Sequence, residues 1–277
     1  MSIWRYKEIT KSLPLHDVLL LTLNESDTLV NKIELNGLVI FLKREDLNPT
    51  GSWKDRAAAY KLTLLKAQKV KEAVLVSSGN AAISFLTYSK IYPEIVLHIV
   101  LNNDANITKV GVIQKLLTNT HHKLYLSDTP KATGVKIASL RKAINLRSGN
   151  YPLIYNAYLS LGFELAELLN KKEDNSQTAI FMPVSSGTAF IGAALGINQK
   201  VGDEYNMPKL IACQTEAVHP LKPELKSMVE KSVSDSIFDK LCENQQRIKK
   251  IITNSNGTVL VPKEDEIVAA KNLLLDK

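Results

Sequence analysis

Cysteine is scarce in this chain, and long apolar runs are missing. Its 277 residues include two cysteines, Cys213 and Cys242. Neither has a ligand-like partner at a suitable spacing, so we expect neither a disulfide framework nor a metal site. No apolar stretch approaches the roughly 20 residues of a membrane-spanning helix, and the first residues lack the apolar core of a signal peptide. We therefore expect no membrane partner and a cytoplasmic location.

Acidic residues are fewer than basic ones, and the formal net charge is +7. A basic balance can indicate a nucleic-acid partner. The lysines, however, recur with helical spacing among apolar residues, as Lys61, Lys66 and Lys69 do, and this pattern is typical of a solvated surface. We therefore expect a small-molecule substrate and no nucleic acid. The length allows one large domain or two modest ones.

From residue 38 onward, short apolar runs alternate with helix-length segments. Such alternation predicts an α/β fold with parallel sheets and crossover helices. A turn cluster at 149–152 is the best signal for a domain boundary, and the polar stretch 218–250 is hard to assign. The expected strands are 38–42, 73–76, 95–101, 123–126, 179–184, 210–214 and 258–261, and the expected helices are 57–69, 81–92, 106–117, 135–146, 159–169 and 189–200.

Ligands of parallel α/β sheets bind where strands end and loops enter helices. The first such loop, 48–56, places Lys54 at a helix entrance. A cation is unexpected there, because the N-terminal end of a helix carries partial positive charge. Lys54 is either a solvated lysine beside Asp55 or a nucleophilic amine whose pKa is lowered by burial.

Two later loops also carry unusual chemistry. In the loop 77–80, the amide of Asn80 can donate and accept hydrogen bonds to a planar ligand, although a plain capped turn is the alternative. In the loop 183–189, backbone amides and hydroxyls can form a phosphate cradle. Gly192 and Gly196, in the helix that follows, can instead serve close helix packing. An amine, an asparagine turn and a phosphate cradle are together what a pyridoxal phosphate site needs.

The order of these loops resembles a known family. The segment 48–56, Asn-Pro-Thr-Gly-Ser-Trp-Lys-Asp-Arg, is similar to the Asn-Pro-Thr-Gly-Ser-Phe-Lys-Asp-Arg signature of threonine synthases, within the fold type II (tryptophan synthase beta-like) enzymes that depend on pyridoxal phosphate. The loops 77–80 and 183–188 resemble that family's second and third loops, and 208–216 resembles its later strand. The resemblance runs from about residue 4 to the last residue.

The resemblance implies two parallel-type sheet domains. A larger domain is expected from 1–58 and 150–277, with the Schiff-base lysine and the phosphate loop. A smaller α/β domain is expected from 59–149, with the loop 77–80. Relatives are commonly dimers, so a homodimer is expected by analogy.

The resemblance also assigns roles to residues. Lys54 is the catalytic residue that forms a Schiff base with pyridoxal 5'-phosphate, and Asn80 contacts the cofactor ring hydroxyl. The implied activity is that of a carbon–oxygen lyase, which converts O-phosphohomoserine and water to threonine and phosphate. Arg56 is a candidate for the substrate, although it can equally be a surface or ion-pair residue. The expected phosphate-binding residues are Ser185, Ser186, Gly187, Thr188 and Ala189, and the other candidates for the substrate are Ser77, Ser78 and Asn156.

Several segments depart from the family pattern. The early Gly-Glu-Gly-x-Thr-Pro-Leu motif is replaced at 24–30, with Thr28 as its relic, and Ala81 stands where threonine usually follows the asparagine. The segment 156–164 lacks the usual Glu-Gly-x-Lys-Thr. The family continues past the expected helix 264–275 with a segment that faces the pyridine nitrogen, so this segment is expected to be lacking. These departures leave open a serine or threonine dehydratase, a sulfhydrylase, or a catalytically impaired paralogue.

Overall fold

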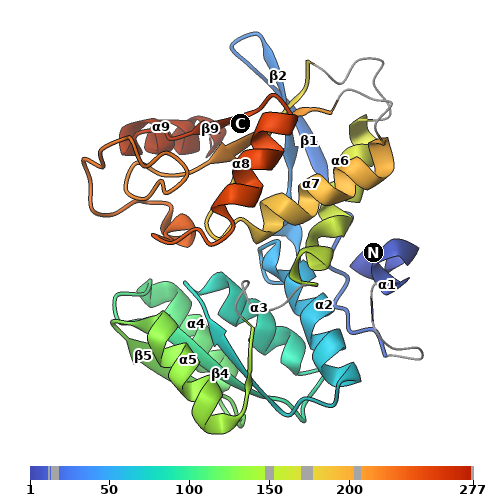
Figure 1. Ribbon diagram of the computed structural model, residues 1–277, viewed down its shortest axis with the longest axis vertical. Helices are drawn as coiled ribbons and strands as arrows, with labels where there is room; N and C mark the ends of the chain where they lie inside the picture. The colour runs from blue at the N-terminus through green and yellow to red at the C-terminus, as the bar shows by residue number, and fades with distance from the viewer. Residues whose placement is uncertain (12, 14–18, 147–152, 170–176, 203–206, 276–277) are drawn as a thin grey trace. The chain divides into compact units, whose positions relative to one another are not determined.

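The computed structural model describes residues 1–11, 13, 19–146, 153–169, 177–202 and 207–275 (Figure 1). The chain divides into two compact units, Met1–Ser160 and Leu161–Lys277. The turn cluster expected at 149–152 lies outside the described residues, and the interleaved division into two domains stays a prediction. No helix in the described part of the chain is both long and apolar enough to cross a membrane.

The first unit is built on a parallel sheet in the order β5-β4-β3-β6. Its strands are β3 (Glu72–Val76), β4 (Val96–Asn102), β5 (Lys123–Ser127) and β6 (Ile144–Asn145). The interior of β3 is buried and apolar, as expected for a central strand covered on both faces. The expected strands at 73–76, 95–101 and 123–126 are confirmed.

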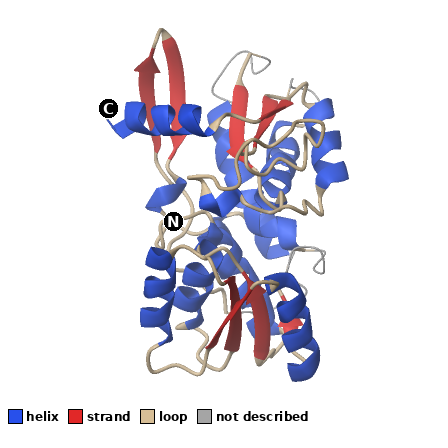
Figure 2. Cartoon of the chain, turned by 90° about the vertical axis from the view of Figure 1, so that its left-hand side faces the viewer, coloured by secondary structure: helices blue, strands red, loops and turns tan. Residues whose placement is uncertain are grey.

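Helices flank this sheet (Figure 2). Helix α5 packs against β3 and β4, and α3 packs against both α2 and α4. The helix expected at 135–146 was placed too late. It ends at Arg141 because Lys142 adopts a left-handed conformation, with φ of 52°, and the residues after it pair with β3 as β6. The helices are α2 (Lys54–Ala67), α3 (Asn80–Ser89), α4 (Ile107–Leu117), α5 (Pro130–Arg141) and the 3-10 helix η4 (Ile154–Tyr158).

The expectation of a buried parallel strand at 38–42 is wrong. These residues belong to β2 (Leu38–Lys43), which pairs antiparallel with β1 (Val30–Leu35). Asn36 and Gly37 form the two-residue turn with φ of 50° and 77°, the backbone that tight hairpins require. Half or more of the side chain surface is exposed at several apolar positions of β2. The short elements around this hairpin are η1 (Ile3–Arg5), α1 (Lys7–Lys11) and η2 (Glu45–Leu47).

The second unit holds a three-stranded parallel sheet in the order β7-β8-β9. Its strands confirm the runs expected at 179–184, 210–214 and 258–261. Helix α8 overlaps the end of the stretch 218–250, which was hard to assign from the sequence. It buries one side, through Ile248 and Ile252. The elements are β7 (Ala179–Pro183), β8 (Lys209–Cys213), β9 (Thr258–Leu260), α6 (Leu159–Leu169), α7 (Thr188–Val201), α8 (Gln245–Asn254), α9 (Glu264–Leu275) and η5 (Asp235–Ile237).

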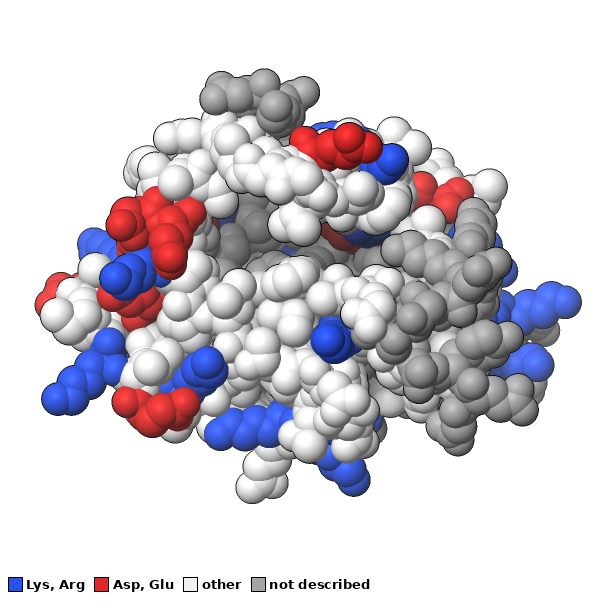
Figure 3. Space-filling model, turned by 90° about the horizontal axis from the view of Figure 1, so that it is seen from above, with Lys and Arg blue, Asp and Glu red and all other residues white. Residues whose placement is uncertain are grey.

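Both sheets confirm the predicted α/β class with parallel strands and crossover helices. On the face drawn in Figure 3, basic side chains lie interspersed with acidic ones among the described residues. This distribution is what the spacing of the lysines predicts for a solvated surface.

His122 is held between β4 and α3 by both ring nitrogens. Nδ1 accepts the N–H of Leu97 at 3.1 Å, and Nε2 lies 2.9 Å from Ser89 Oγ. Burial lowers the pKa of His122, and the nearby His121 and His98 lower it further. The unfolded chain therefore binds a proton at His122 more readily than the folded chain does. The folded state keeps its full stability above the unfolded pKa of about 6.5 and is destabilised as the pH falls below that value.

We expect His122→Asn to weaken this acid sensitivity, because the replacement does not titrate. The check is the denaturation midpoint of both proteins between about pH 5 and pH 7. A variant that loses stability with acid as steeply as the parent would contradict the assignment.

Candidate active site

Lys54 is the first residue of α2, and the loop before it is fixed by its neighbour Asp55. Asp55 is buried, and its Oδ2 accepts the N–H of Thr50 at 2.7 Å. The other oxygen accepts the hydroxyl of Thr50 and, at 2.5 Å, that of Ser84 on α3. Burial raises the pKa of Asp55, and these hydrogen bonds oppose the rise. One carboxylate thus joins the Lys54 loop to the helix that begins at Asn80.

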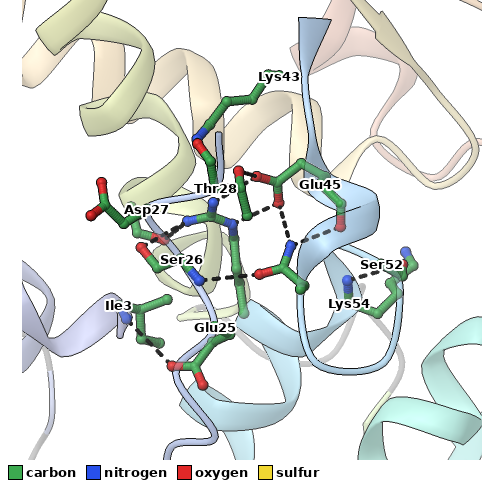
Figure 4. A network of polar contacts seen from close by, with 12 residues as sticks. Ile3, Glu25, Ser26, Asp27, Thr28, Lys43, Glu45, Ser52 and Lys54 are labelled. Atoms are coloured by element: carbon green, nitrogen blue, oxygen red, sulfur yellow. Dashed lines mark hydrogen bonds and ion pairs between the residues drawn. The ribbon is translucent and has the colours of Figure 1, made fainter. Parts of the chain in front are cut away.

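Arg56 is fully buried and makes a bidentate pair with Glu45. Figure 4 shows Glu45 in a polar network with Thr28 and Ser26 nearby. The Nε and Nη2 atoms of Arg56 lie 2.8 and 2.7 Å from the two carboxylate oxygens. Nη1 donates to Ser26 at 3.2 Å and to Ser160 at 2.9 Å. The sequence leaves several roles open for Arg56, and these contacts agree with the role of an ion-pair residue.

The early segment 24–30 joins the same cluster, although its sequence departs from the family pattern. Thr28 donates its hydroxyl to Glu45 at 2.7 Å. The N–H of Ser26 donates to the side-chain oxygen of Asn48 at 3.1 Å, and the amide of Asn48 donates to Glu45 at 3.0 Å. Glu45 is not among the residues predicted from the sequence, where its only signal is that it is an acid eleven residues before Arg56.

The amine of Lys54 is chemically unusual. The residue is half-buried, and its backbone N–H donates to Ser52 Oγ at 3.2 Å. Burial lowers the pKa of Lys54 to about 8, so a larger share of the amine is neutral near physiological pH than in an exposed lysine. A lowered pKa agrees with the nucleophilic interpretation, and the role of Lys54 stays a prediction.

A second buried amine, missed from the sequence, lies two turns further along α2. Burial lowers the pKa of Lys61 to about 7, with a smaller contribution from the charge of Lys54. Its Nζ donates to the backbone oxygen of Leu146 at 3.0 Å. Lys61 therefore holds the end of β6 against α2.

The second loop brings Asn80 to the first position of α3. Gly79 precedes it with φ of 131°, a conformation that disfavours other residues. Ser77 Oγ accepts the N–H groups of Gly79 at 2.9 Å and Ala82 at 3.2 Å. These contacts of Ser77 are those of a capped turn, the alternative given for this loop. Ser78 is exposed and Asn80 is half-buried.

Asn156 lies in the first unit on η4, which packs beside α2. Its amide is 3.4 Å from the hydroxyl of Tyr60. It is half-buried beside the middle of α2, and its assignment to the substrate stays a prediction.

In the second unit, the loop after β7 forms an uncapped helix N-terminus. Gly187 adopts φ of 79° before α7, no side chain caps this end, and the first turn carries no acid. Ser186 and Thr188 place their hydroxyls 3.1 Å apart, while Ser185 is half-buried and Ala189 is buried. Backbone amides at a helix N-terminus, with hydroxyls beside them, suit a phosphate dianion.

Helix α8 supports this loop from within the same unit. Asn244 donates its amide to the backbone oxygen of Ser186 at 2.7 Å. A Cβ added to Gly187 would lie 2.1 Å from Cδ1 of Ile248. Asn244 and Ile248 were not predicted from the sequence, because neither follows a strand.

The residues present therefore fit pyridoxal phosphate. The first unit offers an amine of lowered pKa and the Asn80 turn, joined through Asp55. The second unit offers an anion-binding helix end.

Comparison with known proteins gives consistent results. A family model described as pyridoxal-phosphate dependent enzyme matches residues 21–277. Mitochondrial threonine dehydratase of Schizosaccharomyces pombe is 23% identical over 249 residues, which cover 88% of this chain and 40% of that protein. Threonine synthase of Methanosarcina acetivorans is 24% identical over 262 residues, which cover 90% of this chain and 62% of that protein. The chain thus spans less than two thirds of the length of either relative.

Among solved structures, O-ureido-L-serine synthase matches with a TM-score of 0.70 at 14% identity, over 90% of this chain and 77% of that one. At this identity the likeness concerns the fold alone. It confirms the α/β architecture predicted from the sequence.

Proposed function

Because the chain belongs to the pyridoxal-phosphate dependent enzyme family, with the fold type II architecture, we propose that it is a carbon–oxygen lyase acting on an amino acid. The first candidate reaction is that of a threonine synthase, which turns O-phosphohomoserine and water into threonine and phosphate. The observation that carries the proposal is Lys54 at the entrance to α2, with a pKa lowered to about 8.

In this proposal the chain's own residues bind, orient and move protons. Lys54 would hold the cofactor through its side-chain amine and, once the substrate amine has displaced it, would move a proton at the substrate Cα. Asn80 binds the ring hydroxyl, and the N-terminus of α7 holds the phosphate. Pyridoxal phosphate, when bound, supplies the electron sink for charge that develops at Cα.

A second candidate is a threonine or serine dehydratase. A phosphorylated substrate requires a cation or several donors, yet the guanidinium of Arg56 is paired with Glu45. Ala81 also replaces the threonine that helps hold the substrate in threonine synthases. The dehydratase of Schizosaccharomyces pombe and the synthase of Methanosarcina acetivorans are similar to this chain to nearly the same degree.

We expect Lys54→Ala to abolish covalent attachment of the cofactor. The protein is incubated with pyridoxal phosphate, reduced with borohydride and mapped by peptide mass spectrometry. Lys54 should carry the label, and the visible absorbance of the unreduced protein should disappear in the variant. Attachment to the parent should speed up as the pH rises toward about 8, because the neutral amine is the nucleophile.

Lys66→Ala is the matched control, since Lys66 lies in the last turn of the same helix, with its amine 5.5 Å from the centre of the Tyr92 ring. The control should keep both the label and the colour. Labelling spread over many lysines, or unchanged in Lys54→Ala, would refute the cofactor site.

The two candidate reactions differ in their products. O-phosphohomoserine should release inorganic phosphate if the synthase assignment is right. Threonine or serine should release ammonia if the dehydratase assignment is right. Cofactor attachment without either product would support an impaired paralogue and refute the lyase proposal.

A further inference from the structure

The edge of β1 that faces away from β2 carries backbone groups that do not pair with β2. Leu35 and Leu38 close the two-residue turn, so every second residue of β1 exchanges hydrogen bonds with β2. The bond from the N–H of Arg44 to the oxygen of Leu29, at 2.9 Å, continues this alternation past the strand. It follows that the N–H and C=O groups of Val30, Lys32 and Glu34 face away from β2.

Within the described ranges, β1 pairs with β2 and no further strand. An open strand edge is a template for another strand, and proteins usually protect it with charged side chains, proline, a bulge or a covering element. Neither β1 nor β2 contains proline, and their register runs without a bulge from Val30↔Lys43 to Leu35↔Leu38. The remaining protection is the pair of exposed charges on Lys32 and Glu34, so this edge can accept a strand whose charges complement them.

The charges on β1 are self-complementary. Lys32 and Glu34 lie on one face of the strand, with 57% and 72% of their side chains exposed, and their charged groups are 3.4 Å apart. If two copies pair antiparallel about a two-fold axis through Ile33, each Lys32 lies opposite a Glu34 of the other copy. A shift of the axis by one residue would instead place Lys32 opposite Lys32 or Glu34 opposite Glu34, and like charges directly opposite destabilise a sheet.

We propose that a second copy of this chain pairs along β1 in this register, which gives a four-stranded antiparallel sheet across a two-fold axis. In this register Lys32 of one copy faces Glu34 of the other. These two residues also direct their backbone N–H and C=O groups toward the open edge. Backbone hydrogen bonds and charge pairs therefore coincide in one register.

The apolar surface of the hairpin agrees with this occupant. Leu38, Val39 and Phe41 expose 66%, 52% and 52% of their surface. A two-stranded ribbon is marginal in water, whereas a wider sheet with an apolar face is stable. Pairing of two copies along β1 widens the two-stranded ribbon to four strands, with Val39 and Phe41 on the same face as Lys32 and Glu34.

Charge reversal of β1 tests the proposal. Sedimentation of the full-length chain over a concentration series should show a monomer–dimer equilibrium. Lys32→Glu and Glu34→Lys should each weaken dimerisation by about tenfold or more, because each creates two like-charge pairs across the axis. The double exchange Lys32→Glu with Glu34→Lys restores opposite charges and should restore the dimer.

Lys71→Glu is the control for net charge, because Lys71 is exposed and lies outside the hairpin, immediately before β3. This variant should leave the dimer unchanged. A chain that stays monomeric, a dimer that tolerates both single reversals, or a double exchange that fails to rescue would each overturn the proposal. The rescue also separates lost pairing from misfolding.

A cysteine at the axis gives an independent positive test. In the proposed register, Ile33 faces its own copy in a non-hydrogen-bonded pair, with Cα atoms about 4.5 Å apart, close enough for a disulfide. Ile33→Cys should form a covalent dimer on mild oxidation. Ile40→Cys, on the far strand of the hairpin, should not, and equal cross-linking of both variants would contradict the register.

Discussion

Replacing Arg56 by methionine is expected to lower the free energy of unfolding by about 3–5 kcal/mol, the range seen when one partner of a buried ion pair is removed. Methionine keeps much of the side-chain volume but has no donors. The carboxylate of Glu45 would lose its bidentate partner, and the hydroxyls of Ser26 and Ser160 would each lose a hydrogen bond. Chemical denaturation of both proteins measures the difference.

Arg44→Met is the matched control. Arg44 makes a similar two-point contact with Asp46, at 2.9 and 2.7 Å, but 35% and 57% of the two side chains are exposed. Exposed pairs contribute about 0–1 kcal/mol, so this variant should be nearly neutral. Equal losses in the two variants would show that burial of Arg56 does not set its contribution.

Gly162→Ala is expected to cost about 3 kcal/mol, at the upper end of the usual cost of overpacking. A Cβ at this position of α6 would lie 2.2 Å from the backbone oxygen of Ala193 and 2.7 Å from Cα of Gly196 on α7. Both obstacles are backbone atoms, so no side chain can turn aside. Because α7 carries the phosphate loop, we also expect weaker affinity for pyridoxal phosphate, measured by titration of the apoprotein.

Gly111→Ala separates this packing effect from helix propensity. Gly111 also lies inside a helix, α4, but a Cβ there meets nothing within 4 Å. Alanine should therefore stabilise the protein by about 0.5–1 kcal/mol. The two substitutions should have opposite signs in the same denaturation assay, and a gain from Gly162→Ala would refute the close approach of α6 and α7.

The alternation of strands and helices could be predicted because it is written in local patterns. The runs at 73–76 and 95–101 are apolar and short, and the structure buries them in parallel strands. The run 38–42 has the same composition yet lies in an exposed hairpin. The Asn36–Gly37 turn was the overlooked signal, because such a dipeptide between two strands indicates a hairpin. Similarly, Pro130 marks the first turn of α5.

The residues of the candidate site could be proposed from the sequence, but the contacts that hold them in place could not. Lys54, Asn80 and the loop after β7 each follow a recognisable element boundary. The contacts that hold them join residues far apart in the chain: Asp55 and Ser84 are 29 residues apart, and Asn244 and Ser186 are 58 apart. No local pattern specifies such pairs. For Arg56 the sequence left two interpretations, and the choice depended on burial.

The contacts around the Lys54 loop bear on what its sequence signature reports. Most polar side chains of the signature form hydrogen bonds or ion pairs within the protein. Their partners are one another, Glu45 and neighbouring backbone groups, and the residues concerned are Asn48, Thr50, Asp55 and Arg56. Most of the signature therefore encodes the shape that presents one amine, and little of it can encode the identity of the molecule that reacts there. Chains with different substrates can share such a signature, so it is a diagnostic of architecture, and substrate specificity has to be sought in residues outside it.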